Sequence, residues 1–145
     1  MQQVFSILIS FGLSIVVWAG ETISEGQLAK GTKWETPFYV RVNGQDGPTV
    51  VITGGIHGNE PAGARAAEQI RHWPITRGRL VVIPQANIPG LRDGTSFLPG
   101  EPPSRRDLNR QFPKTKMAAE AHGVLGKALW KFIGDQNPDW MIDLH

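Results

Sequence analysis

Residues 49–61, with the sequence Thr-Val-Val-Ile-Thr-Gly-Gly-Ile-His-Gly-Asn-Glu-Pro, run from an apolar segment through two glycines to a proline. The β-branched, apolar residues 49–53 are typical of a strand that is buried on both faces. The two glycines allow a tight turn, and Pro61 fits the first turn of a helix. The stretch therefore predicts a strand, a turn and a helix over residues 61–73, with a ligand site at the carboxyl end of the strand.

Strand and helix patterns continue on both sides of this stretch. Apolar runs at residues 79–84 and 139–145 are typical of strands, and residues 117–133 carry apolar side chains at helical spacing. Residues 37–43 alternate apolar and polar side chains, and the Gly-Gln-Asp-Gly turn that follows predicts a hairpin with the strand at 49–53. This order of elements indicates an α/β sheet whose ligands gather at the carboxyl ends of its strands.

Composition and charge exclude some classes of partner. The net charge is +2, and Lys and Arg are scattered among Asp and Glu. Because phosphate neutralisation requires a concentrated basic stripe, we expect no nucleic acid partner. The chain has no cysteine, so a bound metal would be held by histidine and carboxylate side chains.

The first 19 residues differ from the rest of the chain. Residues 4–19 form an uncharged, mostly apolar run, with Val17 and Ala19 at the positions that a signal peptidase recognises. We predict a signal peptide over residues 1–19, cleaved after Ala19, and export to the periplasm or the medium. The amino-terminal Met-Gln-Gln has no Lys or Arg, so an uncleaved membrane anchor is the alternative, and only then would the membrane be a partner.

A histidine and a carboxylate follow the predicted strand at residues 49–53 and its two glycines. His57 and Glu60 lie three residues apart at a strand-to-helix turn, where they can converge on one ion. His145 ends the last predicted strand, which an α/β sheet would place beside the end of strand 49–53. Two histidines and one glutamate around an open position form a catalytic zinc site, and Asp143 could orient one ligand. In the alternative interpretation, Glu60 interacts with the helix dipole, His57 lines a turn and Asp143 satisfies backbone groups.

A second polar group lies in the segment from Gln85 to Pro113. This segment is rich in Pro, Gly, Asn and Arg, and it is too long to be a simple connection, so we expect it to be functional. Within it, Asn109 and Arg110 could hold a carboxylate through an amide and a planar fork of N–H donors. Taken alone, Arg110 would be a surface charge and Asp107 a turn former.

Three segments together resemble the signature segments of the succinylglutamate desuccinylase and aspartoacylase family, within the zinc carboxypeptidase superfamily. They are residues 54–63 (GGIHGNEPAG), 107–113 (DLNRQFP) and 139–145 (DWMIDLH). The resemblance covers residues 37–145, as the amino-terminal part of a catalytic domain, with residues 20–36 as a polar lead-in. It implies an α/β fold with a mixed, largely parallel sheet flanked by helices, truncated after the strand that carries His145.

The resemblance also implies a function. It assigns one Zn²⁺ ion to His57, Glu60 and His145, the carboxylate of an acylated amino acid or peptide to Asn109 and Arg110, and support of that loop to Asp107. The implied activity is hydrolysis of an amide or ester bond of an N-acyl amino acid or peptide by metal-activated water. Alternatives are an exported zinc carboxypeptidase or cell-wall peptide amidase, and a non-catalytic metal- or carboxylate-binding fragment.

One expected group has no match in the sequence. In the family a glutamate that transfers the proton comes from a strand well beyond the third zinc ligand, here His145. We therefore assign no general base and expect this chain alone to be inactive. Glu68 and Glu120 are interpreted as helix-surface residues, and Glu101 as a loop residue.

The arginine that polarises the carbonyl is also unmatched. The dipeptide Thr95-Ser stands where relatives often carry it. Arg105 or Arg106 could replace it, although a basic pair on a proline-rich loop is ordinarily solvated. His72 and His122 fall in predicted helices and are interpreted as surface or helix-end residues.

Overall fold

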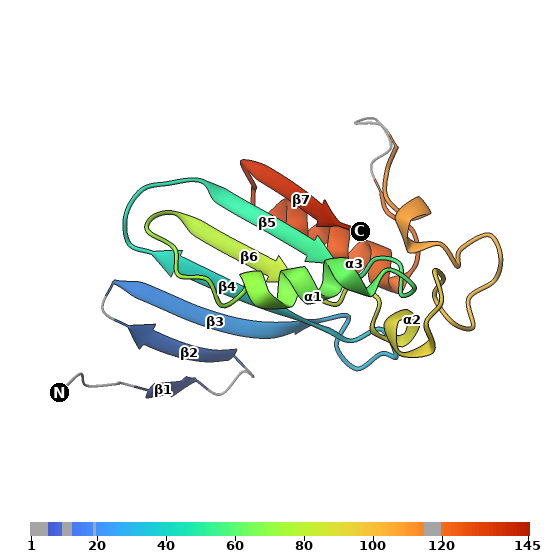
Figure 1. The fold of residues 1–145 in the computed structure, drawn as a ribbon, viewed down its shortest axis with the longest axis horizontal. Helices are drawn as coiled ribbons and strands as arrows, with labels where there is room; N and C mark the ends of the chain where they lie inside the picture. Colours follow the sequence, from blue (N-terminus) through green and yellow to red (C-terminus); the bar gives the residue numbers. More distant parts are fainter. Residues whose placement is uncertain (1–5, 10–12, 19, 115–119) are drawn as a thin grey trace.

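A mixed β-sheet runs through the computed structural model, which describes residues 6–9, 13–18, 20–114 and 120–145. Its strand order is β1-β2-β3-β4-β6-β5-β7, and Figure 1 shows β5 between β6 and β7. The strands are β1 (Ser6–Ile9), β2 (Leu13–Trp18), β3 (Glu21–Leu28), β4 (Thr36–Asn43), β5 (Thr49–Gly54), β6 (Arg79–Ile83) and β7 (Trp140–Leu144).

The predicted α/β fold with a mixed sheet is confirmed. Strand β5 pairs in parallel with β6 and with β7, whereas the pairs from β1 to β4, and β4 with β6, are antiparallel. The parallel part is therefore smaller than we expected. It nevertheless contains the strands that precede the candidate site, because the carboxyl ends of β5 and β7 lie side by side.

The predicted hairpin between residues 37–43 and 49–53 is wrong. Strand β4 pairs with β3 and β6, and β6 lies between β4 and β5. The apolar character of β5 agrees with its position in the parallel part of the sheet, where helices cover both faces. The polar lead-in, residues 20–36, contains β3, which pairs along its whole length with β4.

Helices cover both faces of the sheet. Helix α1 (Pro61–Ile70) packs on the face where Ile52, Leu80 and Val82 point, with Ala67 in the same apolar cluster. Helix α3 (Val124–Asp135) covers the opposite face, where its Phe132 and Ile133 pack against a cluster containing Val51 and Val81 (Figure 1). The alternation of buried side chains along β5 and β6 thus places one helix on each side.

Two helix boundaries differ from the sequence prediction. Helix α1 ends at Ile70, so His72 lies in a turn beyond it. Helix α3 begins at Val124, seven residues later than predicted, and His122 precedes it. Gly123, with a φ of 65°, is the residue before the helix, and a left-handed backbone angle interrupts a right-handed helix. Residues 117–119 of the predicted helix lie outside the described residues.

Short helical segments interrupt the predicted long loop. They are α2 (Ile88–Asp93) and a 3-10 helix (Leu108–Arg110), and Asp107 caps the latter by accepting a hydrogen bond from the Asn109 backbone N–H at 3.0 Å. Leu108 is fully buried, which anchors this loop to the core.

The amino-terminal segment lies partly outside the described residues, which omit residues 1–5, 10–12 and 19. Its described parts form β1 and β2, and β2 pairs antiparallel with β3. None of the helices in the described part of the chain is long and apolar enough to span a membrane. The signal peptide at residues 1–19 stays a prediction.

Candidate metal centre

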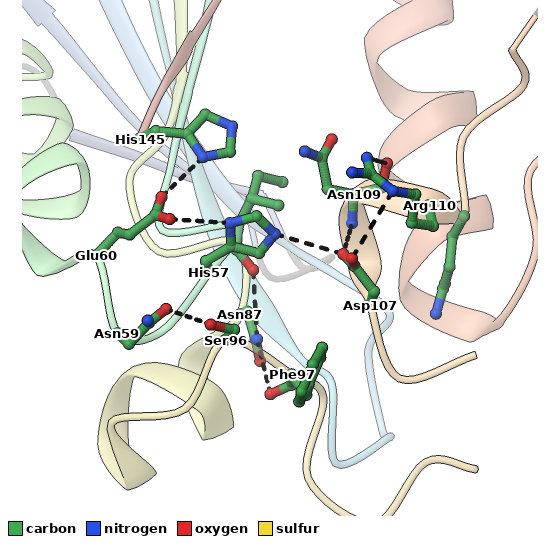
Figure 2. A network of polar contacts seen from close by, with 12 residues as sticks. His57, Asn59, Glu60, Asn87, Ser96, Phe97, Asp107, Asn109, Arg110 and His145 are labelled. Atoms are coloured by element: carbon green, nitrogen blue, oxygen red, sulfur yellow. Dashed lines mark hydrogen bonds and ion pairs between the residues drawn. The ribbon is translucent and has the colours of Figure 1, made fainter. Parts of the chain in front are cut away.

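Two turns at the carboxyl edge of the sheet supply the three predicted ligands. His57 and Glu60 lie between β5 and α1, and His145 directly follows β7. Gly55 turns the chain out of β5 with a φ of 71°, a backbone angle that side chains with a Cβ rarely adopt. Pro61 then starts α1, so that Glu60 faces back toward the sheet edge (Figure 2).

The three side chains converge as predicted. One ligand atom from each of His57, Glu60 and His145 lies within 4.8 Å of the others. Nδ1 of His57 is 3.2 Å from Oε1 of Glu60, and Nδ1 of His145 is 2.8 Å from Oε2 of the same carboxylate. Figure 2 shows the Glu60 carboxylate in contact with the imidazole rings of both histidines. These groups, of which Glu60 and His145 are 85 residues apart in the sequence, form one cluster of atoms that could hold a metal ion.

The far nitrogen of each imidazole lies against a second carboxylate. Nε2 of His57 is 3.4 Å from Oδ1 of Asp107, and Nε2 of His145 is 2.9 Å from Oδ2 of Asp143. Asp143 also accepts a hydrogen bond from the Thr53 hydroxyl at 2.7 Å. When Nε2–H donates to a carboxylate, Nδ1 keeps its lone pair, which is the arrangement that holds a metal-binding histidine in one tautomer.

Charge pairing within the cluster shifts two pKa values. The hydrogen bond from His145 lowers the pKa of Glu60 below its usual range, with a further contribution from His57. In turn, the hydrogen bond to Glu60 raises the pKa of His145. The cluster therefore favours an ionised Glu60, which is the form that binds a cation.

Close packing of α1 on β7 brings the two halves of the cluster together. A Cβ atom added to Gly63 would stand 2.0 Å from the Leu144 carbonyl oxygen and 3.1 Å from the carbonyl carbon of His145. Glycine at position 63 therefore lets the helix that begins after Glu60 approach the end of β7 more closely than a residue with a side chain would. The sequence did not predict this role, since a glycine within a helix pattern has no distinct local signal.

The predicted carboxylate-binding pair lies beside His57. Figure 2 shows Asn109 and Arg110 on the opposite side of His57 from Glu60. The Arg110 side chain is 68% exposed, and its Nε is 4.0 Å from Oδ2 of Asp107, so the guanidinium remains accessible to a ligand. Asp107 therefore contacts the loop, as predicted, and also His57, which the sequence did not reveal because 50 residues separate them.

Arg106 and Ser96, in the same loop, have partners other than the three candidate ligands. The guanidinium of Arg106 lies 4.1 Å from the centre of the Phe97 ring. Ser96 donates a hydrogen bond to Oδ1 of Asn59 at 2.7 Å, joining the loop after α2 to the turn that carries the ligands (Figure 2). That link was also not predicted, because neither residue has a charge or a recognisable spacing.

Glu68, Glu101 and Glu120, none of which was assigned as general base from the sequence, each lie near a cationic side chain. Glu68 pairs with Arg71 at 2.6 Å, Glu101 lies 3.9 Å from the Lys33 ammonium, and Glu120 lies 3.8 Å from that of Lys127. Their interpretation as helix-surface or loop residues is confirmed for Glu68 and Glu101, whereas Glu120 precedes α3 and lies in a loop.

The fold and the cluster together define an α/β protein with a candidate centre for one metal ion. Residues 46–145 match the model of the succinylglutamate desuccinylase/aspartoacylase catalytic domain. This match covers more than half of the chain, which therefore belongs to that family, a family of desuccinylase/aspartoacylase-type hydrolases. A search among curated proteins found no match.

Solved structures of relatives have the same fold. An aspartoacylase family protein from Mesorhizobium loti is 24% identical, with a TM-score of 0.66, over 94% of this chain and 44% of that one. A succinylglutamate desuccinylase/aspartoacylase from Rhodobacter sphaeroides is 27% identical, with a TM-score of 0.60, over 83% of this chain and 37% of that one. The ectoine utilization protein EutE from Ruegeria pomeroyi is 24% identical, with a TM-score of 0.63, over 94% and 43%. The chain thus spans less than half the length of these relatives.

Proposed function

We propose that the protein carrying this chain is a zinc-dependent hydrolase that cleaves an amide or ester bond of an N-acyl amino acid or peptide. The observation that carries the proposal is the convergence of His57, Glu60 and His145 within 4.8 Å. The family supports hydrolysis, and this donor set supports the metal, since two histidines and one carboxylate leave a fourth position of zinc open.

The donor atoms lie close enough to one another to share one ion. Zinc lies about 2.0 to 2.2 Å from nitrogen and carboxylate oxygen ligands, so neighbouring ligand atoms of a tetrahedral site are about 3.3 Å apart. Here Nδ1 of His57 lies 3.2 Å from Oε1 of Glu60, and Nδ1 of His145 lies 2.8 Å from Oε2 of the same carboxylate. A zinc ion held there would supply Lewis acidity for the scissile carbonyl and for an attacking water.

The polar residues around the cluster have separate parts in this proposal. Asp107 and Asp143 hold His57 and His145 in the tautomer whose Nδ1 is free to bind the metal. Asn109 and Arg110 bind the free carboxylate of the substrate through an amide and a guanidinium fork. A bound carboxylate would fix the scissile bond relative to the ligands, because these residues flank His57.

Zinc binding by matched variants tests the metal assignment. We expect the chain to bind one zinc ion per molecule, and we expect His57→Ala to weaken binding at least 100-fold, because only two ligands remain. The control is His72→Ala, which removes an exposed imidazole that lies 3.7 Å from Glu68. Equal zinc affinity in the wild type and His57→Ala would refute the site. Hydrolysis of N-acyl amino acids by the natural protein, abolished by a chelator and restored by zinc, tests the activity.

A further inference from the structure

A mostly apolar cavity of about 240 Å³ adjoins the candidate metal centre. It lies between α3, β7 and the 3-10 helix. Leu129 and Ile133 of α3 and Met141 of β7 line it, together with Phe112 beyond the 3-10 helix. A dry cavity of about 150 Å³ accepts benzene, so this one has room for a leucine or phenylalanine side chain.

The cavity and the metal centre share residues. Asn109, one of the proposed carboxylate-binding residues, lines the cavity, and so does Asp143, which contacts His145 at 2.9 Å. Thr53, at the same end, donates its hydroxyl to Asp143. The polar residues of the cavity therefore lie where it meets the site. In a substrate whose carboxylate is held at Asn109 and Arg110, the carbon atom that bears the carboxylate would lie at the mouth of the cavity. The side chain on that carbon atom could then enter the cavity.

The charges of the residues that line the cavity favour some substrate side chains over others. Of the described residues that line it, none is a Lys, an Arg or a His, and Asp143 contributes a carboxylate. An acidic substrate side chain would lose its hydration without gaining a cationic partner, and it would approach a like charge. An apolar side chain would instead replace water against Leu129, Ile133 and Phe112.

We propose that this cavity is the subsite for the side chain of the amino acid that carries the free carboxylate, and that this side chain is apolar. The inference rests on the proposed function and names its substrate class, N-acyl derivatives of leucine-like or phenylalanine-like amino acids. Burial of a leucine-sized side chain improves binding by about 10- to 100-fold relative to glycine, which has no side chain.

A panel of three substrates tests the subsite in the natural protein loaded with zinc. We expect kcat/KM for N-acetyl-leucine to exceed that for N-acetylglycine by about 10- to 100-fold, and N-acetyl-aspartate to be the poorest of the three. The second measurement is calorimetric binding of the same compounds to the zinc-free protein, because protein side chains line the cavity and no metal is needed to form it. It should give the same order of affinity.

Two isoleucines provide a matched pair of variants. Ile133→Phe adds volume inside the cavity, whereas Ile70→Phe adds the same volume on the opposite face of the sheet, where Ile70 lines a groove beside α1. We expect Ile133→Phe to reduce the leucine-to-glycine ratio of kcat/KM at least tenfold and Ile70→Phe to leave that ratio unchanged. General damage to the fold would lower kcat/KM for both substrates and would therefore leave their ratio unchanged.

The outcomes separate the subsite from the activity. Hydrolysis that is equal for the three substrates, or fastest for N-acetyl-aspartate, would overturn the subsite while leaving the proposed function intact. If none is hydrolysed but the zinc-free protein prefers N-acetyl-leucine, the cavity is an apolar subsite and the hydrolytic proposal fails. Absence of both hydrolysis and preferential binding would overturn the subsite and the proposed function together.

Discussion

Gly63→Ala should weaken zinc binding even though Gly63 donates no ligand. The added Cβ would lie 2.0 Å from the Leu144 carbonyl oxygen, whereas ordinary contact begins at 3.4 Å. Helix α1 and β7 would therefore have to separate by about 1.4 Å at the point of contact, a change typical of overpacked interiors. Glu60 precedes α1 and His145 follows β7, so their 2.8 Å contact would lengthen as well.

The expected magnitudes follow from that displacement. Overpacking of this kind costs about 1 to 3 kcal/mol of the free energy of unfolding. A shift of about 1 Å at one ligand should lower zinc affinity about 10- to 100-fold, comparable with the loss of a supporting contact around a metal ligand. Zinc titration by calorimetry and thermal denaturation of the zinc-free chain measure the two effects separately.

The control is Gly134→Ala in α3, where an added Cβ has no neighbour within 4 Å. It should leave zinc affinity unchanged and stabilise the helix by about 0.5 to 1 kcal/mol. Wild-type zinc affinity in folded Gly63→Ala would refute the reasoning, because it would show that the distance between α1 and β7 does not govern the cluster.

Two further predictions concern the cluster itself. Asp107→Asn should lower zinc affinity about 10- to 100-fold in a zinc titration, because the amide keeps the shape but loses the charge facing His57; unchanged affinity would exclude Asp107 as a supporting group. In the zinc-free chain, the pair of Glu60 and His145 should stabilise the fold most between about pH 4.5 and pH 6.5, the ordinary pKa values of the two groups. This stabilisation is lost as pH rises through the raised pKa of His145 and as pH falls through the lowered pKa of Glu60, so melting temperatures of wild type and His145→Ala should converge at both extremes.

The sequence was sufficient to predict the parts of the fold that depend on local pattern. The apolar run of β5, the proline at the start of α1 and the position of His145 after β7 together predicted that three ligands would meet. That prediction needed only the rule that parallel neighbours present their carboxyl ends at one edge. At the candidate metal centre, the structure predicted from local sequence patterns and the tertiary arrangement agree.

The partner of each strand was less predictable. Residues 37–43 alternate in polarity as a hairpin strand does, but the alternation does not specify which strand pairs with it. Strand β6 takes the place between β4 and β5. Strand β3 was missed because its sequence is largely polar and its only buried apolar side chain is at Leu28. The contact of Asp107 with His57 likewise depends on how the 3-10 helix packs, through buried Leu108, and local sequence does not encode that packing.

The pairing of β7 with β5 also determines when the cluster can be completed during synthesis. Glu60 and His145 are 85 residues apart, which a ribosome traverses in about 4 to 17 s at ordinary rates of elongation. Throughout that interval His57 and Glu60 have been translated without their third partner. Parallel pairing across such a separation is slow compared with helix formation. A site built from all three candidate ligands is therefore complete only after β7 has been synthesised and paired with β5.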